Sequence, residues 1–439
     1  MKIAKRVFFL VVGLIAVIAI GFYLFLQIRE VRSRNVLVHG QSQSIVKIAV
    51  DRILWDIARN AITHPGYYRQ EGKTPARPGA SMRLDEAVVI PANLYFFSTE
   101  SDTLTFYAML QVRDEQVLKV SLQYHLGIDS SAFAHDKGYW YVSSENKRFS
   151  FVGNDKEVLM AVNLDRLDKI ERLRDMWHYR SKMMKPIKEM EGFDFGKEKA
   201  DIVYYDRWNK NTATADFGQG KIISTADIAL DLIHLTDKPQ ARVLPVGNVL
   251  NFYCHADLKP LFEKYRHTLS NYNIPIDTLK QYYGGYMDIQ WKQGGVLQQD
   301  TVVAYDYDDS FELIPKKEVR EEAVPNLILT LRMSPHLSAY LPQKIFYVFH
   351  QARKEDLIGL STAAQFENSY AFEDTGQAFH MVYNRDASVM KYLGWIPCID
   401  RIQSWKICGK RAAEKRTEFK SELTMADPHI HALAQLITD

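Results

Sequence analysis

The stretch from Thr103 to His125 reads TLTFYAMLQVRDEQVLKVSLQYH and carries a clear two-residue periodicity. From Leu104 to Val112, strongly apolar side chains alternate with Thr, Tyr, Met and Gln, as they do on a strand with one buried face. After a polar break at 113–116 the alternation resumes as far as Tyr124. The sequence therefore predicts a long antiparallel hairpin over residues 103–125.

The same order of strand, glycine-containing turn and strand recurs further along the chain. Glycine suits these turns because it adopts the positive φ that tight hairpins demand. Three more hairpins are predicted in this way, over residues 149–162, 212–230 and 286–307. The periodicity becomes helical at residues 44–62 and 164–190. These patterns predict an α+β fold of long antiparallel hairpins with intervening helices.

A faint internal repeat accompanies the hairpins. Asn248–Tyr253 precedes a helical stretch at 258–269, and Asn326–Leu331 precedes another at 335–351; the two strands start 78 residues apart. Asn93–Phe97 resembles them, although a hairpin follows it directly. A period of this length exceeds that of a solenoid and favours a duplicated β-α-β-β unit. Chance similarity between apolar strands is the alternative.

An uncharged apolar segment, Val7–Gln27, lies near the N-terminus. Its 21 residues reach about 31 Å as a helix, which is the thickness of a hydrocarbon core. Cations flank both ends, so orientation follows from the short N-terminal tail, and the bulk of the chain is predicted outside the cytoplasm. The alternatives are the inverted orientation and a signal peptide cleaved near Ala19–Gly21, against which the apolar run continues to Leu26. A single-pass membrane protein is expected, periplasmic if bacterial.

The chain is thus divided into five predicted segments. They are a short tail at 1–6, a transmembrane anchor at 7–27, an amphipathic helix and linker at 28–83, a first α+β unit at 84–240, and a second α+β unit at 241–439 with a basic helical tail. The cations of that tail gather at 406–420, where interspersed glutamates favour a solvated helix over a membrane-binding face.

Composition excludes some functions and leaves others open. The 439 residues include 55 Lys and Arg against 53 Asp and Glu, so no overall positive field exists to attract a nucleic acid. The absence of Asn-x-Ser/Thr acceptor sites favours a bacterial envelope over a eukaryotic lumen. Cys398 and Cys408 form a possible disulfide, with two ordinary thiols as the alternative, and Cys254 is expected to be a lone buried thiol on a strand.

Signatures of chemistry are weak. The chain has no glycine-rich phosphate loop, nucleophile elbow, zinc-binding helix or paired CxxC, so no cofactor is predicted. Asp306 and Asp308 have the DxD spacing that holds a divalent cation in many sugar-nucleotide transferases, but acidic residues are also common where strands end. His429-x-His431 and Cys254-His255 lack the three or four local ligands of a stable site.

Two functional hypotheses follow. The first is a membrane-anchored extracytoplasmic protein that is not an enzyme, binding or scaffolding a lipid or an envelope protein. Aromatic strands at Tyr139–Tyr141 and Gln281–Tyr283 would line its groove, unless they serve only in packing. The alternative is a type II membrane-anchored transferase that uses a divalent metal at Asp306 and Asp308.

Overall fold

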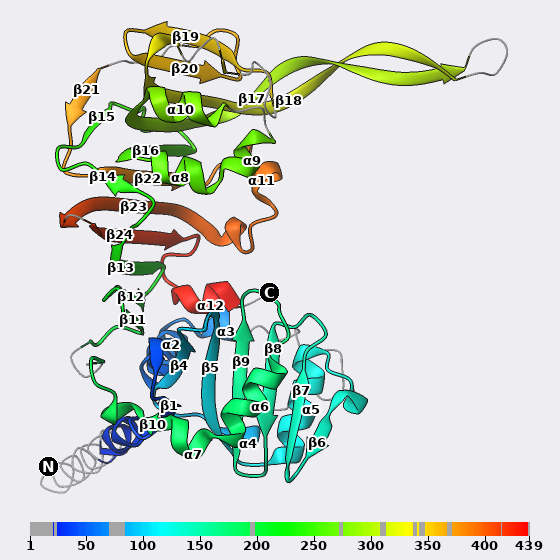
Figure 1. Cartoon of the computed structure of the whole chain (residues 1–439), viewed down its shortest axis with the longest axis vertical. Coiled ribbons are helices and arrows are strands. Elements are labelled where there is room, and N and C mark those ends of the chain that lie inside the picture. The colour runs from blue at the N-terminus through cyan, green and yellow to red at the C-terminus, as the bar shows by residue number, and fades with distance from the viewer. Residues whose placement is uncertain are drawn as a thin grey trace, which may run out of the picture. The chain divides into compact units, whose positions relative to one another are not determined.

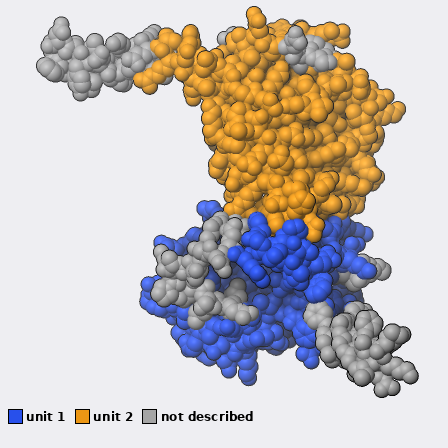
Figure 2. Space-filling view, turned by 180° about the vertical axis from the view of Figure 1, so that it is seen from behind, with its two compact units in different colours: residues 1–217 blue, residues 218–439 orange. Residues whose placement is uncertain are grey.

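The computed structural model describes residues 21, 24–69, 84–193, 198–271, 275–307, 313–336, 340–341, 347–366, 371–413 and 415–437, without the side chains from 300 to 318. Within these ranges the protein is mostly antiparallel sheet with helices, so the predicted α+β class is confirmed (Figure 1). Two compact units make up the chain: unit 1, residues 1–217, and unit 2, residues 218–439 (Figure 2).

Unit 1 is built on one antiparallel sheet with the order β12–β11–β2–β4–β5–β9–β8–β7–β6. Its strands are β2 (Ser42–Ile48), β4 (Leu94–Thr99), β5 (Asp102–Val112), β6 (Ala134–Asp136), β7 (Tyr139–Ser143), β8 (Phe149–Gly153), β9 (Glu157–Asn163), β11 (Ile202–Asp206) and β12 (Thr212–Phe217). The short β3 (Val88–Val89) pairs with the end of β5, and β1 (Leu37–His39) pairs separately with β10 (Met184–Pro186).

Helices cover this sheet. They comprise residues 24–33, α2 (Val50–Thr63), α3 (Pro65–Tyr68), α4 (Leu84–Ala87), α5 (Glu115–Leu126), α6 (Ile170–His178) and α7 (Arg180–Met183). Leu173, Met176 and Trp177 of α6 lie three and four residues apart, so they share one face, and that face is buried against the sheet. The helix predicted over 164–190 is therefore confirmed only for the residues of α6 and α7, because Met184–Pro186 is a strand.

The predicted hairpin at 103–125 is half right. Its first arm is β5, but its second arm is the helix α5. The carboxylate of Asp114 accepts the backbone N–H of Gln116 at 2.9 Å and of Val117 at 3.1 Å, which caps the helix, and Gly127 ends it with φ of +65°. Apolar residues at every second position also include positions four apart, and Leu118 and Leu122 are buried as such a pair.

Two other predictions fail for tertiary reasons. The amphipathic helix predicted over 44–62 starts only at Val50, because residues 44–48 belong to β2 and pair with β4 and β11 on either side. The hairpin predicted over 286–307 is one long strand. Gly294, with φ of +76°, lies at a register irregularity within that strand and makes no turn.

Unit 2 has a second antiparallel sheet, with the order β13–β24–β23–β22–β16–β17–β18–β20–β19. Its strands are β13 (Lys221–Ala229), β16 (Leu250–Asp257), β17 (Tyr283–Tyr307), β18 (Leu313–Met333), β19 (His350–Lys354), β20 (Leu357–Ser361), β22 (Phe379–Asn384), β23 (Ile402–Ala413) and β24 (Arg416–Met425). The division between the units falls before the predicted boundary at 240, since β13 pairs with β24 near the other end of the chain.

The remaining elements of unit 2 are short. They are β14 (His234–Leu235), β15 (Gln240–Arg242), β21 (Phe372–Asp374), α8 (Lys259–Lys264), α9 (Arg266–Ser270), α10 (Ile276–Tyr282), α11 (Met390–Leu393) and α12 (Ala432–Ile437). α12 confirms a helix at the C-terminus, but the prediction of a basic helical tail is wrong for residues 406–420, which lie on the hairpin β23–β24. Cross-strand ion pairs such as Lys410 with Glu418, at 2.9 Å, stabilise that hairpin in place of helical pairs.

A buried ion pair holds β15 and its partner β21 against the main sheet of unit 2. Arg242 donates from Nε and Nη2 to the two carboxylate oxygens of Asp288, both at 2.6 Å, and from Nη2 to Thr330 Oγ1 at 2.8 Å. The side chains of Arg242 and Asp288 are 1% and 0% exposed. Burial raises the pKa of Asp288, and the bidentate bonds from Arg242 oppose that shift.

β17 and β18 continue beyond the sheet as a two-stranded ribbon (Figure 1). From the pair Gly295–Pro325 to the pair Tyr307–Leu313 the register is unbroken. At its start, Gln298 exchanges hydrogen bonds with Val348 and donates one to Thr362 O, which ties the base of the ribbon to unit 2. The ribbon was not predicted, because local periodicity cannot show that two paired strands extend beyond the other strands of their sheet.

The two sheets begin in the same way. In unit 1 the order along the chain is β2, the helices α2 to α4, the two-residue strand β3, β4 and β5, with the late strand β11 beside β2. In unit 2 it is β16, the helices α8 to α10, β17 and β18, with the late strand β22 beside β16. The strands of the predicted repeat occupy different positions, since Asn248–Tyr253 leads into β16 whereas Asn326–Leu331 belongs to β18. In the second predicted copy, residues 335–336 form a single turn and 350–351 belong to β19, so no described residue there is α-helical.

The predicted anchor at 7–27 lies almost entirely outside the described residues. Among the residues that are described, no helix is both long enough and apolar enough to cross a membrane.

Candidate functional site

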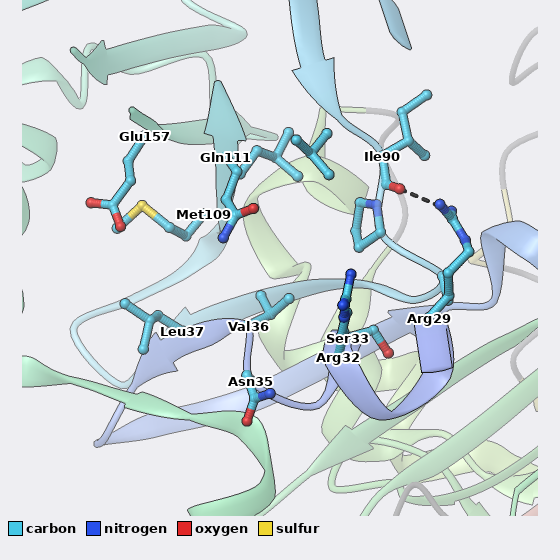
Figure 3. Close-up of a pocket in the computed structure, with 14 residues that line it drawn as sticks. Arg29, Arg32, Ser33, Asn35, Val36, Leu37, Ile90, Met109, Gln111 and Glu157 are labelled. Carbon is cyan, nitrogen blue, oxygen red and sulfur yellow. Dashed lines mark hydrogen bonds between the residues drawn. The ribbon is translucent and has the colours of Figure 1, made fainter. Parts of the chain in front are cut away.

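A pocket of about 360 Å³ lies in unit 1 where residues 29–37 meet the segment 89–92 and the end of β5 (Figure 3). We call it the N-terminal pocket. Apolar side chains form most of its wall: Val36, Leu37, Val89, Ile90, Pro91, Ala92, Met109 and Leu110. Arg32, Asn35, Gln111 and Glu157 add polar groups around them. Its size is at the low end of the range for small-molecule sites.

Arg29 fixes the helical residues 24–33 to the rest of unit 1. Its Nε and Nη2 donate to the two carboxylate oxygens of Asp51 at 2.7 and 2.8 Å, and Nη2 also donates to Ile90 O at 3.0 Å. The last of these bonds is drawn in Figure 3. The hydrogen bonds to Asp51 raise the pKa of Arg29. The guanidinium is thus committed to structure and is not available to a ligand.

A second set of polar contacts, from Asn93, also holds this helix. Asn93, which is 2% exposed, donates from Nδ2 to Glu30 Oε2 and, at 2.9 Å, to Ser33 Oγ. Ser33 Oγ in turn donates to Glu30 O at 2.7 Å. Burial raises the pKa of the neighbouring Tyr95 to about 12, so it stays a neutral phenol. These bonds preorganise the wall of the N-terminal pocket.

Two charged groups of the pocket wall, Glu157 and Arg32, differ in whether an oppositely charged neighbour pairs with them. Glu157 lies 3.5 Å from Arg180, which partly neutralises it. Arg32 is exposed, and within the described ranges it has no ion-pair partner. Arg32 is therefore the group that can meet an anion, next to an apolar wall that can accept a hydrocarbon. This combination suits an amphipathic ligand with a negative head.

The side chains of the two weak metal candidates lie outside the description. Asp306 lies on β17 opposite Ile314, near the end of the ribbon, and its side chain is outside the description, as is the whole of Asp308. Where side chains are described, no group of three His, Cys, Asp or Glu residues is placed to hold a metal ion.

The cysteines are free thiols in the structure. A disulfide needs its two Cα atoms within about 7 Å. Cys408 lies six residues into β23, about 20 Å along the strand from Ile402, and the four residues back to Cys398 form a tight turn. The possible Cys398–Cys408 disulfide is therefore incompatible with β23. Cys254 is a lone buried thiol on β16, as expected, and burial raises its pKa to about 12.

Of the two predicted aromatic strands, Tyr139–Tyr141 lies on β7, but Gln281 and Tyr282 end the helix α10 and only Tyr283 belongs to a strand, β17. Trp140 is 1% exposed and Tyr283 is 6% exposed. Tyr139 and Tyr141 pack against the main core of unit 1, where the guanidinium of Arg174 lies 4.5 Å from the ring centroid of Tyr141. At these two segments the described rings favour the packing alternative over the predicted groove.

Sequence reasoning missed the N-terminal pocket. Its wall joins segments about 20 to 120 residues apart, and contacts such as Arg29 with Asp51 follow no local pattern. The one available signal was the cluster of arginines at 29, 32 and 34, which was assigned to membrane topology alone. Comparison of the chain with known protein families, characterised proteins and solved structures gives no match.

Proposed function

We propose that this protein is a single-pass, membrane-anchored binding protein of a bacterial envelope, with residues 7–27 as the transmembrane helix and the bulk of the chain in the periplasm. The observation that carries the proposal is the position of the N-terminal pocket. Its first wall, residues 29–37, follows the apolar segment 7–27 after one residue, so a spanning helix at 7–27 would bring the pocket close to the membrane surface.

The ligand class follows from the wall. Burying methylene groups against Val36, Leu37 and Met109 contributes about 0.8 kcal/mol for each CH₂. Arg32 then meets a phosphate or carboxylate head. A volume of about 360 Å³ admits part of one acyl chain, not a whole two-chain phospholipid. We therefore favour an anionic lipid that inserts one chain into the pocket.

Native mass spectrometry of the full chain, purified from its own host in a mild non-ionic detergent, tests this function. A co-purifying anionic lipid is expected. Arg32→Gln removes the charge at the pocket and should lower lipid occupancy about tenfold, the loss of one charge-assisted contact. Arg34→Gln is the matched control, because Arg34 is an exposed neighbour that pairs with Glu30 and does not line the pocket. Equal lipid loss in both variants, or no bound lipid in the wild type, would overturn the proposal.

The alternative, a metal-dependent transferase, predicts a divalent ion in the same spectra that is lost on Asp306→Ala. None of the described contacts favours it over lipid binding.

We also infer that the two units arose by duplication of a β-α-β-β unit. The support is their shared order: first strand, helix, second strand and third strand, with a late strand returning beside the first. The equivalent strands in this alignment are β2 with β16 and β4 with β17.

A further inference from the structure

A second hollow in unit 1, of about 920 Å³, shares no residue with the N-terminal pocket. It forms where three turns meet: the turn between β1 and β2, the turn between β4 and β5, and the turn between β11 and β12. β11, β2 and β4 are antiparallel neighbours in the sheet, so these turns come to the same edge. The helix α6 adds Arg172. We call this hollow the Trp208 groove.

Trp208 presents an exposed ring from a firmly held turn. The carboxylate of Asp206, itself 5% exposed, accepts the backbone N–H groups of Trp208 and Asn209, both at 2.9 Å. Asp206 N donates to Asn211 O at 2.8 Å, which closes the turn, and Arg207 N donates to Gln43 O at 2.8 Å, which ties the turn to the start of β2. Yet Trp208 is 64% exposed. The backbone is fixed while the indole is left to solvent, which is an arrangement that suits a stacking surface.

Two guanidinium groups line the same groove. Arg172 donates from Nη2 to Ser101 Oγ at 3.0 Å, which orients it with a neutral partner. In the part of the chain that the structure describes, neither Arg172 nor Arg207 forms an ion pair with a carboxylate. Glu100 lies on the lining and reduces the net charge by one, so one positive charge remains. Guanidinium groups with unused donors bind carboxylates in a bidentate manner.

Small polar groups complete the lining. Ser101 carries an exposed hydroxyl and Gln41 an exposed amide, whereas the hydroxyls of Ser42 and Thr99 are buried, and Ser42 Oγ already donates to His39 O at 2.6 Å. Hydroxyls and amides of this kind donate to and accept from the hydroxyl groups of a sugar. The open groove has room for more than one ring, whereas a lone inorganic anion is usually held by a closed set of donors.

We propose that the Trp208 groove binds an acidic carbohydrate, with one sugar ring against the indole of Trp208 and a carboxylate on Arg172 and Arg207. This inference is independent of lipid binding at the N-terminal pocket. It gives the protein a second ligand, of a different chemical class, on the same unit.

Isothermal titration calorimetry tests the proposal. The full chain in non-ionic detergent is titrated with hexagalacturonate, and uncharged cellohexaose and inorganic phosphate are the comparison probes. Hexagalacturonate should bind, and binding should weaken as salt rises. Trp208→Ala should weaken it about tenfold, because stacking on an aromatic ring is worth roughly 1–3 kcal/mol. Arg172→Gln and Arg207→Gln should each weaken it about tenfold or more.

Matched controls exclude a general loss of folding or charge. Trp395→Ala removes another exposed tryptophan, 79% exposed and in unit 2, and Arg148→Gln removes another exposed arginine of unit 1. Both should bind hexagalacturonate as the wild type does, and circular dichroism should be unchanged in every variant. Lipid occupancy should be the same in Trp208→Ala and the wild type, which separates this test from that of the proposed function.

Three results would overturn the proposal. The absence of hexagalacturonate binding would contradict the proposed carbohydrate site directly. Equal affinity for cellohexaose would show that the arginines play no part, and displacement of the oligosaccharide by low millimolar phosphate would reduce the groove to a simple anion site. Tighter binding of a single-stranded oligonucleotide, lost in the same variants, would assign the groove to nucleic acid instead.

Discussion

Unit 1 and unit 2 have sheets that begin with the same strand order but keep their buried polar groups in different places. In unit 1 the cluster beneath α6 is mainly apolar, with Tyr107, Leu159 and Leu173 all at 0% exposure, and ion pairs such as Lys169 with Asp102 keep side chains that are 16% and 9% exposed. In unit 2 the apolar clusters are smaller and the pair Arg242–Asp288 lies between strands. Among the described residues, only unit 2 thus combines this strand order with an ion pair whose two side chains are both almost completely buried.

Breaking that ion pair should produce the largest effect. Asp288→Asn leaves the guanidinium of Arg242 buried without a counter-charge, which should lower the free energy of unfolding by about 3–5 kcal/mol. Urea unfolding of the full chain, with hydrogen exchange at the amides of β15, β17 and β18, measures it.

The matched control is Asp227→Asn in the same unit. Asp227 pairs with Arg416 at 3.0 Å, but the two side chains are 46% and 27% exposed, so the cost should be below about 1 kcal/mol. The double variant Arg242→Met with Asp288→Leu should recover most of the loss, because no unpaired charge remains. If Asp288→Asn costs no more than Asp227→Asn, the contrast between the two units is wrong.

A middle-sized effect is expected at the cap of α5 in unit 1. Asp114→Ala frees the N–H groups of Gln116 and Val117 and should cost about 1 kcal/mol, whereas Asp114→Asn should cost much less. Asp155→Ala, at an exposed turn position of the same unit, serves as the control. Hydrogen exchange along 115–126 reports the change. In unit 2 the N-cap residues of α8, α9 and α10 make no side-chain hydrogen bond of this kind.

The smallest effect should come from removing the ribbon. Replacing residues 300–320 by Asn-Gly joins Gln299 to Glu321, which are cross-strand neighbours, through a two-residue turn. In the described backbone beyond that pair, each strand has only the other as its ladder partner, so the free energy of unfolding should change by less than about 0.5 kcal/mol. Ile328→Ala, on β18 but inside the sheet and 0% exposed, should cost about 2–5 kcal/mol. A large loss on shortening would mean that the ribbon supports the sheet.

Some features of the fold could be predicted from the sequence because their causes are local. The hairpin β8–β9 follows from alternation on both sides of a turn in which Asn154 Oδ1 accepts the N–H groups of Lys156 and Glu157. The α+β class, the strand β5 and the lone thiol of Cys254 were predictable for the same reason. Each depends on residues within about ten positions of one another.

The N-terminal pocket and the Trp208 groove could not be predicted from the sequence in this way. The N-terminal pocket needs residues near 29, 90 and 110 together, and the Trp208 groove needs turns near 41, 100 and 207. Exposed Trp208 and the free arginines carry no sequence signature, because the same residue types also serve in packing and solvation. Only the pairing of β11 with β2 and of β2 with β4 brings these turns together.

By itself the sequence determined the sheet-rich class, the turn of the hairpin β8–β9 and the apolar segment at 7–27, since periodicity and turn chemistry act over a few residues. Tertiary structure alone decided whether ambiguous segments became strand or helix. Residues 44–48 became a strand because two neighbours offered hydrogen bonds, and 115–126 became a helix because its capped form buries Leu118 and Leu122. It also decided where the units divide and where the N-terminal pocket and the Trp208 groove lie, because those depend on contacts between residues far apart in the chain.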